Sequence, residues 1–82
     1  MTYAITNEID SFTVDKASAA AGETVTITNV GSSASNTYAH KTGDTSTVVM
    51  QATVISAGGT ATFTMPDYAV TIASNVYSGG DN

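Results

Sequence analysis

Three segments of the chain alternate between apolar side chains and, for the most part, threonine. They are residues 24–28 (TVTIT), 60–65 (TATFTM) and 69–73 (AVTIA). A period of two places successive side chains on opposite faces of a β-strand, so each segment predicts a strand with one buried and one solvent-exposed face. Almost no apolar residues recur at the spacing of a helix. The pattern therefore predicts an all-β protein.

Turn-forming residues divide the remainder of the chain into further short strands. We expect residues 3–6 and 9–14 to form one strand or a broken pair, with Phe12 and Val14 facing inward. The Ala-rich segment 15–23 is predicted to be a loop, because it is short and lacks an apolar helical face. The other expected elements are strands at 24–30, 38–41, 46–50, 60–65 and 69 to about 76, a loop at 31–36, a hairpin turn at 42–45, and turns at 57–59 and 66–68. The run 48–55 is expected to be one long strand or a strand with a bulge near Gln51.

Six or seven short strands separated by turns are typical of a small antiparallel β-sandwich. We therefore predict a single immunoglobulin-like β-sandwich domain over residues 1–77, followed by a flexible tail at 78–82. A β-grasp-like fold and an open barrel are the alternative architectures.

The charge composition excludes several classes of function. Only two lysines oppose seven acidic residues, and arginine is absent, which gives a net charge of −5. Such a chain cannot neutralise a run of phosphates, so we expect no nucleic-acid partner. No apolar stretch approaches the length of a membrane span, and the residues after Met1 do not read as a signal peptide. The lack of cysteine excludes disulfides and thiolate metal sites.

The sequence offers little material for catalysis or metal binding. His40 is the single histidine, and no motif positions a nucleophile or an acid beside it, so we expect an exposed imidazole beside the hairpin. Glu8, Asp10 and Asp67 could together hold a cation, but the acidic residues are dispersed, and ordinary solvated carboxylates are the favoured interpretation. We therefore predict no catalytic, cofactor-binding or metal-binding residues, no cofactor and no enzymatic activity.

Two further groups of residues are candidate sites. Lys16 and Asn75 end the first long strand and the last strand, which is compatible with the adjacency that a Lys–Asn cross-link needs, but the residues around Lys16 are not apolar enough to bury it. The four tyrosines offer a possible sugar-stacking platform, although core-rim residues with a wet hydroxyl are the favoured interpretation. They are Tyr3, Tyr38, Tyr68 and Tyr77.

The threonine rows 24/26/28 and 60/62/64 are similar to the faces with which ice-binding proteins order water. The two rows begin 36 positions apart in the chain and need not be neighbours. We interpret them as ordinary solvent-facing strand residues, because the branched side chain of threonine suits a pleated sheet and its hydroxyl stays hydrated.

The segment 20–27 (AAGETVTI), followed by 59–66 (GTATFTMP) and 69–72 (AVTI), resembles bacterial surface repeats. These are the immunoglobulin-like and internalin-type repeat modules, and the resemblance covers roughly residues 12–74, with Phe63-Thr64-Met65-Pro66 as its most specific part. It implies a non-enzymatic spacer, adhesin domain or binding module.

The predicted strands carry almost no charge, whereas edge strands are usually protected by lysine, inward charges or proline. We therefore expect a structural or interaction module of an extracellular surface or a virion assembly. Its partner is expected to be protein, either another copy or a larger assembly, bound through strand edges or a Thr/Ser-rich sheet face. The alternative is a carbohydrate-binding or adhesin module.

Overall fold

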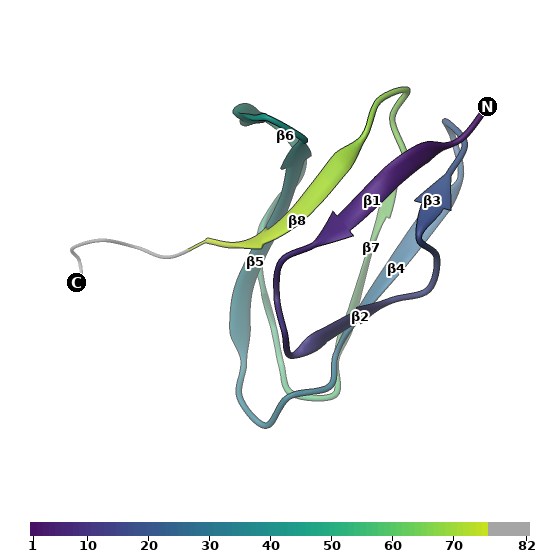
Figure 1. Ribbon diagram of the computed structural model, residues 1–82. Helices are drawn as coiled ribbons and strands as arrows, with labels where there is room; N and C mark the ends of the chain where they lie inside the picture. Colours follow the sequence, from purple (N-terminus) through teal and green to yellow (C-terminus); the bar gives the residue numbers. More distant parts are fainter. Residues whose placement is uncertain (76–82) are drawn as a thin grey trace.

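The computed structural model describes residues 1–75, and all of its regular secondary structure is β-strand (Figure 1). The eight strands, in chain order, are β1 (Tyr3–Asn7), β2 (Phe12–Val14), β3 (Ser18–Ala19), β4 (Thr24–Asn29), β5 (Ser35–Lys41), β6 (Asp44–Ile55), β7 (Thr60–Thr64) and β8 (Val70–Ser74). Residues 1–75 contain no helix long and apolar enough to cross a membrane.

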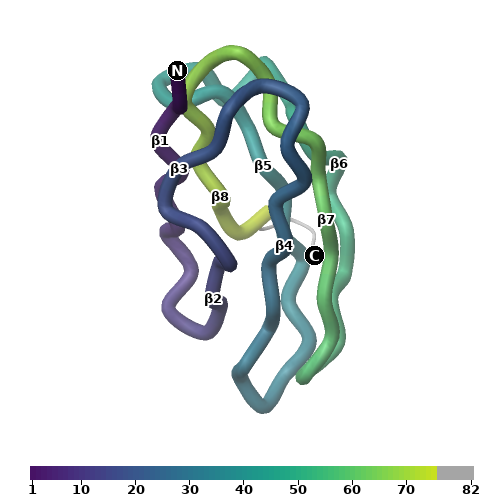
Figure 2. Tube along the Cα trace, turned by 90° about the vertical axis from the view of Figure 1, so that its right-hand side faces the viewer, coloured from purple at the N-terminus to yellow at the C-terminus, as the bar shows by residue number. Residues whose placement is uncertain are grey.

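The strands form two sheets. The larger sheet has the order β3-β1-β8-β5-β6, and the smaller has the order β2-β4-β7. Figure 2 shows the layers nearly edge-on, with β1, β3 and β8 on one side and β4 and β7 on the other. The larger sheet curls so that its last strand, β6, lies beside β7. The predicted fold class, a small all-β sandwich, is confirmed.

Eight strands are present where six or seven were expected. Residues 3–14 form the broken pair, because β1 joins the larger sheet and β2 the smaller one. The segment predicted as a loop at 15–23 contains the two-residue strand β3, which pairs with β1. The pairing of β1 with β8 is parallel rather than antiparallel. A parallel pair needs only a long connection, and here nearly the whole chain lies between the two strands.

Several strand boundaries also differ from the expectation. β5 begins at Ser35, inside the loop predicted at 31–36, and β8 ends at Ser74. The expected extension of the last strand to Val76, the domain boundary at residue 77 and the tail at 78–82 lie outside the described residues.

The predicted hairpin at 42–45 is confirmed and is tighter than expected. β5 and β6 are joined at Thr42-Gly43, where Gly43 has φ +83°, a conformation that favours glycine. β6 is one continuous strand, yet its pairing with β5 shifts register three times, and one shift falls opposite Thr37–Ala39, where Gln51 and Ala52 lie between paired residues. Both the long strand and the bulge near Gln51 are therefore present.

The core fills the space between the two sheets, as the period-two patterns predict. The burial of β4 alternates along the strand, with Val25 and Ile27 fully buried and the threonines between them at the surface. The buried apolar side chains are Phe12, Ala19, Val25, Ile27, Ala39, Met50, Ile55, Phe63, Met65, Val70 and Ile72. β8 differs from the half-buried strand that its pattern predicts, because Thr71 on its outer face is buried too, with its hydroxyl 2.9 Å from that of Thr42.

A buried amide connects the smaller sheet to the end of β6. Asn29 is fully buried, and its Nδ2 donates hydrogen bonds to the carbonyl oxygens of Ser33 (2.8 Å) and Ile55 (2.9 Å). Its Oδ1 accepts a hydrogen bond from the backbone N–H of Gly31 (2.9 Å). Buried polar groups are tolerated when they are bonded in this way, so Asn29 fixes the position of β6 relative to β4.

Candidate interaction surface

The two threonine rows that lie far apart in the sequence are direct neighbours in the structure. β4 and β7 pair antiparallel, with Thr24 opposite Thr64, Thr26 opposite Thr62 and Thr28 opposite Thr60. We call these six residues the threonine ladder. The sequence left open whether the two rows are neighbours, and the structure shows that they are, because sequence separation does not limit which strands pair in a sheet. Thr13 of β2 extends the ladder, since it lies opposite Thr28.

The ladder is regular and is held from behind by the core. Five consecutive residue pairs join β4 to β7 without a register shift, in contrast to β5 and β6. Between the threonines, Val25, Ile27 and Phe63 point the opposite way and are buried. A one-residue slip would expose these apolar side chains and bury the hydroxyls, so packing fixes the register of the ladder.

The hydroxyl groups of the ladder are free to bind an external partner. Within residues 1–75, no ladder hydroxyl makes a hydrogen bond to another protein atom, whereas Thr42, Thr47 and Thr53 elsewhere on the chain do so. Four ladder residues are exposed, and Thr26 and Thr28 are half-buried. The ladder therefore presents methyl and hydroxyl groups together to the solvent.

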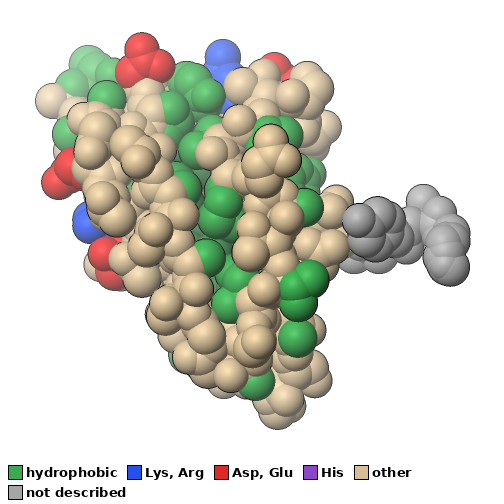
Figure 3. Space-filling model, turned by 180° about the vertical axis from the view of Figure 1, so that it is seen from behind, with side chains coloured by type: hydrophobic (Ala, Val, Ile, Leu, Met, Phe, Trp, Pro, Cys, Tyr) green, Lys and Arg blue, Asp and Glu red, His purple; other side chains and the backbone are tan. Residues whose placement is uncertain are grey.

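Charged side chains lie at the margin of the molecular face that contains β4 and β7. Figure 3 views the molecule from this side and shows acidic and basic groups along one edge and at the top, with an uncharged body between. None of the six ladder positions is charged. The surface therefore offers no charge complementarity to an ionic partner.

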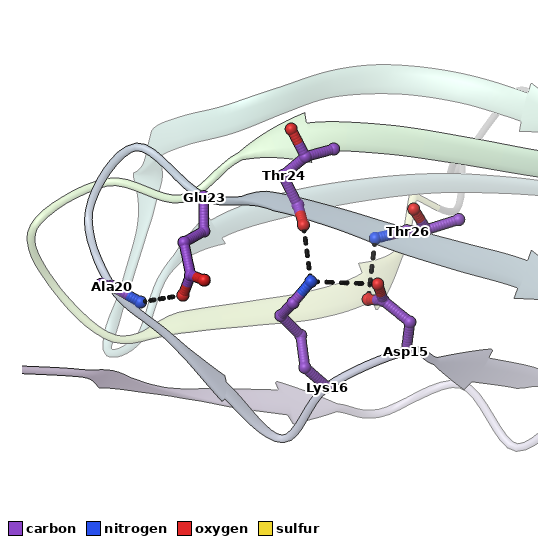
Figure 4. Close-up of polar contacts among 6 residues, drawn as sticks. All are labelled: Asp15, Lys16, Ala20, Glu23, Thr24 and Thr26. Atoms are coloured by element: carbon purple, nitrogen blue, oxygen red, sulfur yellow. Dashed lines mark hydrogen bonds and ion pairs between the residues drawn. The ribbon is translucent and has the colours of Figure 1, made fainter.

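Lys16 and Asp15 cover the edge of β4 beyond the end of β2. β2 pairs only with residues 27–29 of β4, which leaves the backbone of Thr24 and Thr26 without a strand partner on that side. Asp15 Oδ1 accepts a hydrogen bond from the Thr26 N–H (2.9 Å), and Lys16 Nζ donates to the Thr24 carbonyl (2.8 Å), as Figure 4 shows. Nearby, Glu23 accepts a bond from the N–H of Ala20 (2.7 Å).

The contacts of Asp15 with Thr26 and Lys16 also change the pKa of the Asp15 carboxyl group. Lys16 Nζ lies 3.1 Å from Asp15 Oδ2. The hydrogen bond from the Thr26 N–H, followed by the bond from Lys16, lowers the pKa of Asp15 below its ordinary value. Asp15 thus stays ionised and continues to accept the Thr26 N–H in mildly acidic solution.

The strand edges are better protected than the sequence suggested. β3 has two residues and β2 has three, and β6 carries three register shifts. Short edge strands, bulges and the charged pair beside β4 all hinder pairing with another chain. The edges at β2, β3 and β4 are therefore protected, whereas β7, the other edge of the smaller sheet, has five uncharged residues and no register shift, so association through a strand edge stays a prediction beside association through the sheet face.

His40 is buried, contrary to the exposed imidazole that was expected beside the hairpin. It is 6% exposed, its ring lies 5.2 Å from that of Tyr38, and its Nδ1 lies 2.7 Å from the carbonyl oxygen of Lys41. β5 is an interior strand between β8 and β6, so neighbouring strands flank His40 on both sides, and Thr71 lies directly opposite. No arrangement of His40 with a nucleophile and an acid is found in the described residues.

The tyrosines do not gather into one platform. Tyr3 and Tyr68 pack against the core, Tyr38 stacks on His40, and Tyr77 lies outside the described residues. Lys41 Nζ sits over the ring of Tyr68, 5.1 Å from its centroid. No pocket opens on the surface of residues 1–75.

The remaining candidate sites of the sequence are not assembled either. Lys16 contacts Thr24 and Asp15, whereas Asn75 donates its backbone N–H to the carbonyl of Asn36 (2.8 Å), so the structure does not bring Lys16 and Asn75 together. No three histidine or carboxylate side chains in residues 1–75 converge as metal ligands, and Glu8, Asp10 and Asp67 form no such group.

One carboxylate organises the start of β6. Asp44 accepts hydrogen bonds from the hydroxyls of Ser46 and Thr47 (both 2.7 Å) and from the N–H of Ser46 (3.1 Å). These bonds, with the hydroxyl of Ser46 contributing most, lower the pKa of Asp44 to about 2. Asp44 therefore binds the first residues of β6 beside the hairpin turn.

No protein-family model, curated protein or solved structure matches the chain.

Proposed function

We propose that this protein is a non-enzymatic structural or interaction module of an extracellular surface or of a virion, and that it associates with protein through the threonine ladder. The observation that carries the proposal is the direct cross-strand register of Thr24–Thr64, Thr26–Thr62 and Thr28–Thr60. Six identical, uncharged side chains on one face of the smaller sheet, whose hydroxyls make no hydrogen bond within residues 1–75, form a contact surface, and the short strands β2 and β3 and the capped edge of β4 disfavour strand pairing at those edges.

Contact through the ladder alone is weak. Strands about 4.8 Å apart that rise about 3.4 Å per residue give a patch of roughly 10 by 17 Å for five residues of two strands. A stable protein interface buries about 800 Å² on each partner, several times this area. Many copies held on one surface would convert such weak contacts into firm attachment, because each contact after the first becomes intramolecular. The resemblance to bacterial surface repeats agrees with this mode of action.

Sedimentation equilibrium over a wide concentration range tests the proposal. We expect a monomer in dilute solution and weak association at high concentration, with the association abolished in Thr62→Lys, which places a charge at the centre of the ladder. Thr6→Lys is the matched control, because Thr6 is an exposed threonine on β1 of the other sheet. Association that persists in Thr62→Lys and disappears in Thr6→Lys would assign the interface to the larger sheet.

The alternative, a carbohydrate-binding or adhesin module, finds less support. Sugar platforms present the flat faces of aromatic rings to solvent, whereas the described tyrosines lie apart and are half-buried. A glycan array probes this alternative directly, and a hit that disappears in Tyr38→Ala or Tyr68→Ala would favour it over protein association.

A further inference from the structure

The threonine ladder fixes polar groups on a two-dimensional grid. Along each strand, successive ladder residues lie about 6.8 Å apart, because they are two residues of about 3.4 Å each. Across the sheet, directly opposed residues lie about 5 Å apart. Oxygen atoms on the prism faces of ice repeat over distances of similar size in two perpendicular directions. The grid of the ladder is therefore of the right scale to hold water in an ordered layer.

We propose that the threonine ladder adsorbs to ice, with the six hydroxyl groups bonded to water molecules of the lattice and the six methyl groups seated between them. This inference uses the face named in the proposed function, but it concerns the monomer and a different ligand. The ladder has two properties that such a surface requires. Its groups are identical and lie at a fixed repeat, and its hydroxyls make no hydrogen bond to other protein atoms within residues 1–75.

The hydroxyl groups favour an ordered water layer over a tightly packed protein surface. A hydroxyl that is buried without a hydrogen-bond partner destabilises a complex by about 1–3 kcal/mol on the scale of protein mutations. A second ladder packed face to face would have to satisfy many hydroxyls at once within a small area. Lattice water leaves every hydroxyl bonded, and it is continuous in two dimensions. The same feature that weakens protein contact therefore suits adsorption to ice.

Rigidity also favours adsorption, because mobile side chains lose conformational entropy when they bind a lattice. Threonine is branched at Cβ, which restricts its χ1 angle. The backbone beneath it is held by the unshifted β4–β7 register and by the buried side chains of Val25, Ile27 and Phe63. Asp15 and Lys16 fix the free edge of β4 at Thr26 and Thr24. The ladder is thus organised before it meets its ligand.

Charge distribution is the third argument. Charged groups hold hydration shells that do not match a neutral lattice, and the charged side chains of this face lie at its margin (Figure 3). Asp15, Lys16 and Glu23 are engaged with backbone groups there rather than projecting over the ladder (Figure 4). The centre of the ladder, Thr26 and Thr62, has no charged residue in its register.

Ice-affinity partitioning of the full chain tests this inference. A dilute solution, below the concentration at which the chain associates, is frozen slowly from one surface, and the protein in the ice is measured against a non-binding protein of similar size. We expect the chain to be enriched in the ice, with thermal hysteresis and faceted crystals in the same preparation. Thr62→Tyr places a bulky uncharged ring at the centre of the ladder and is expected to abolish the enrichment.

Thr6→Tyr, the same change on β1, is the matched control and is expected to keep the enrichment. Circular dichroism near 0 °C verifies that each variant is folded, and Thr64→Tyr, at the exposed end of β7, replaces Thr62→Tyr if the central variant does not fold. Exclusion of the parent chain from ice would overturn the inference, as would equal enrichment of the ladder variants. Retention on crystalline cellulose or chitin without retention in ice would assign the grid to a polysaccharide surface instead. Sedimentation measures self-association independently of ice binding. The proposed protein association and the proposed ice binding can therefore be refuted separately.

Discussion

Replacement of Asn29 by aspartate tests the account of how the two sheets are joined. The substitution keeps the shape of the side chain and the oxygen that accepts the N–H of Gly31. It replaces the Nδ2 group, which donates to the carbonyls of Ser33 and Ile55, by an oxygen that cannot donate when ionised. Three oxygen atoms would then face one another in a site that is fully buried in the parent.

The magnitude follows from the groups left without partners. Each buried polar group that loses its hydrogen bond destabilises the protein by about 1–3 kcal/mol. Two carbonyls lose their donor, and an uncompensated buried charge is destabilising by about 3–5 kcal/mol. Counting only the carbonyl of Ile55, because water has partial access to that of Ser33, we expect Asn29→Asp to lower the free energy of unfolding by at least about 4 kcal/mol at neutral pH.

The pH dependence distinguishes this mechanism from a general loss of packing. Burial and two facing carbonyls favour the neutral acid, so the folded-state pKa of the introduced aspartate is raised above its unfolded value of about 3.9. Below the unfolded-state pKa the aspartate is protonated in both states, so it lowers the free energy of unfolding least there. This loss of stability grows as the pH rises through the folded-state pKa, because the buried carboxyl must then ionise. We therefore expect the gap between Asn29→Asp and the parent to narrow between pH 7 and pH 3.

Urea unfolding followed by far-UV circular dichroism measures the gap at both pH values. Asn29→Ala is the control, because it removes the two bonds to Ser33 and Ile55, together with the bond from Gly31, without adding a titratable group, and its deficit in the free energy of unfolding should not narrow on acidification. If Asn29→Asp is not folded at pH 7, sulfate or another excluded co-solute restores a measurable transition. A variant within about 1 kcal/mol of the parent at neutral pH would refute the reasoning, because the amide would then be dispensable.

Three further predictions concern the core, the hairpin and its carboxylate. Phe63→Ala removes a ring that is 6% exposed and should lower the free energy of unfolding by about 3–5 kcal/mol in urea titrations, whereas a variant that melts like the parent would place Phe63 outside the core. Gly43→Ala forces a Cβ into a φ of +83° and should destabilise by about 1–2 kcal/mol, measured by thermal unfolding, and an unchanged melting temperature would contradict the strained turn. The folded pKa of Asp44, about 2, lies below its unfolded value, so its contribution is present above about pH 4 and is lost as the pH falls toward 2. Asp44→Asn should therefore flatten the acid-induced loss of stability, and an unchanged pH dependence would contradict this role of Asp44.

The local pattern of the sequence predicted the elements well but not their partners. Period-two alternation placed Val25, Ile27 and Phe63 in the core and the threonines at the surface, because the two faces of a strand are set by geometry that operates within a few residues. Which strand pairs with which depends on the whole chain. The pairing of β4 with β7, and hence the threonine ladder, could therefore not be predicted from the local pattern.

His40 and the strand edges show the same limit. Residues next to a turn are usually exposed, but β5 lies between two strands, and that position buries His40. The sequence contained a usable signal for the protected edge of β4, since Asp15 and Lys16 directly follow β2. Charges at the end of a strand are ordinarily interpreted as turn residues, and only the structure shows that β2 stops short and that these side chains take its place.

Threonine also has high β-propensity, so a competing explanation is that the ladder residues only stabilise the sheet and bind nothing. The double variant Thr26→Lys/Thr62→Glu distinguishes stabilisation of the sheet from binding through the ladder. It places opposite charges at directly opposed positions, and cross-strand pairs of this kind contribute about 0.2–1 kcal/mol relative to alanine pairs, much like other favourable pairs. If the sheet requires only a hydrated, strand-compatible outer face, the free energy of unfolding should therefore stay within about 1 kcal/mol of the parent.

The surface activities should respond in the opposite way. Self-association and enrichment in ice should both disappear in this variant, because a charged pair interrupts the ladder at its centre, while the fold is retained. A loss of stability well above 1 kcal/mol would instead mean that the threonines are needed for the sheet itself. In that case their alignment would be a consequence of folding and would carry no evidence of a binding surface. If the variant stays as stable as the parent but neither associates nor enters ice, the identity of all six residues is explained by what the face binds, since the fold would accept other polar side chains there.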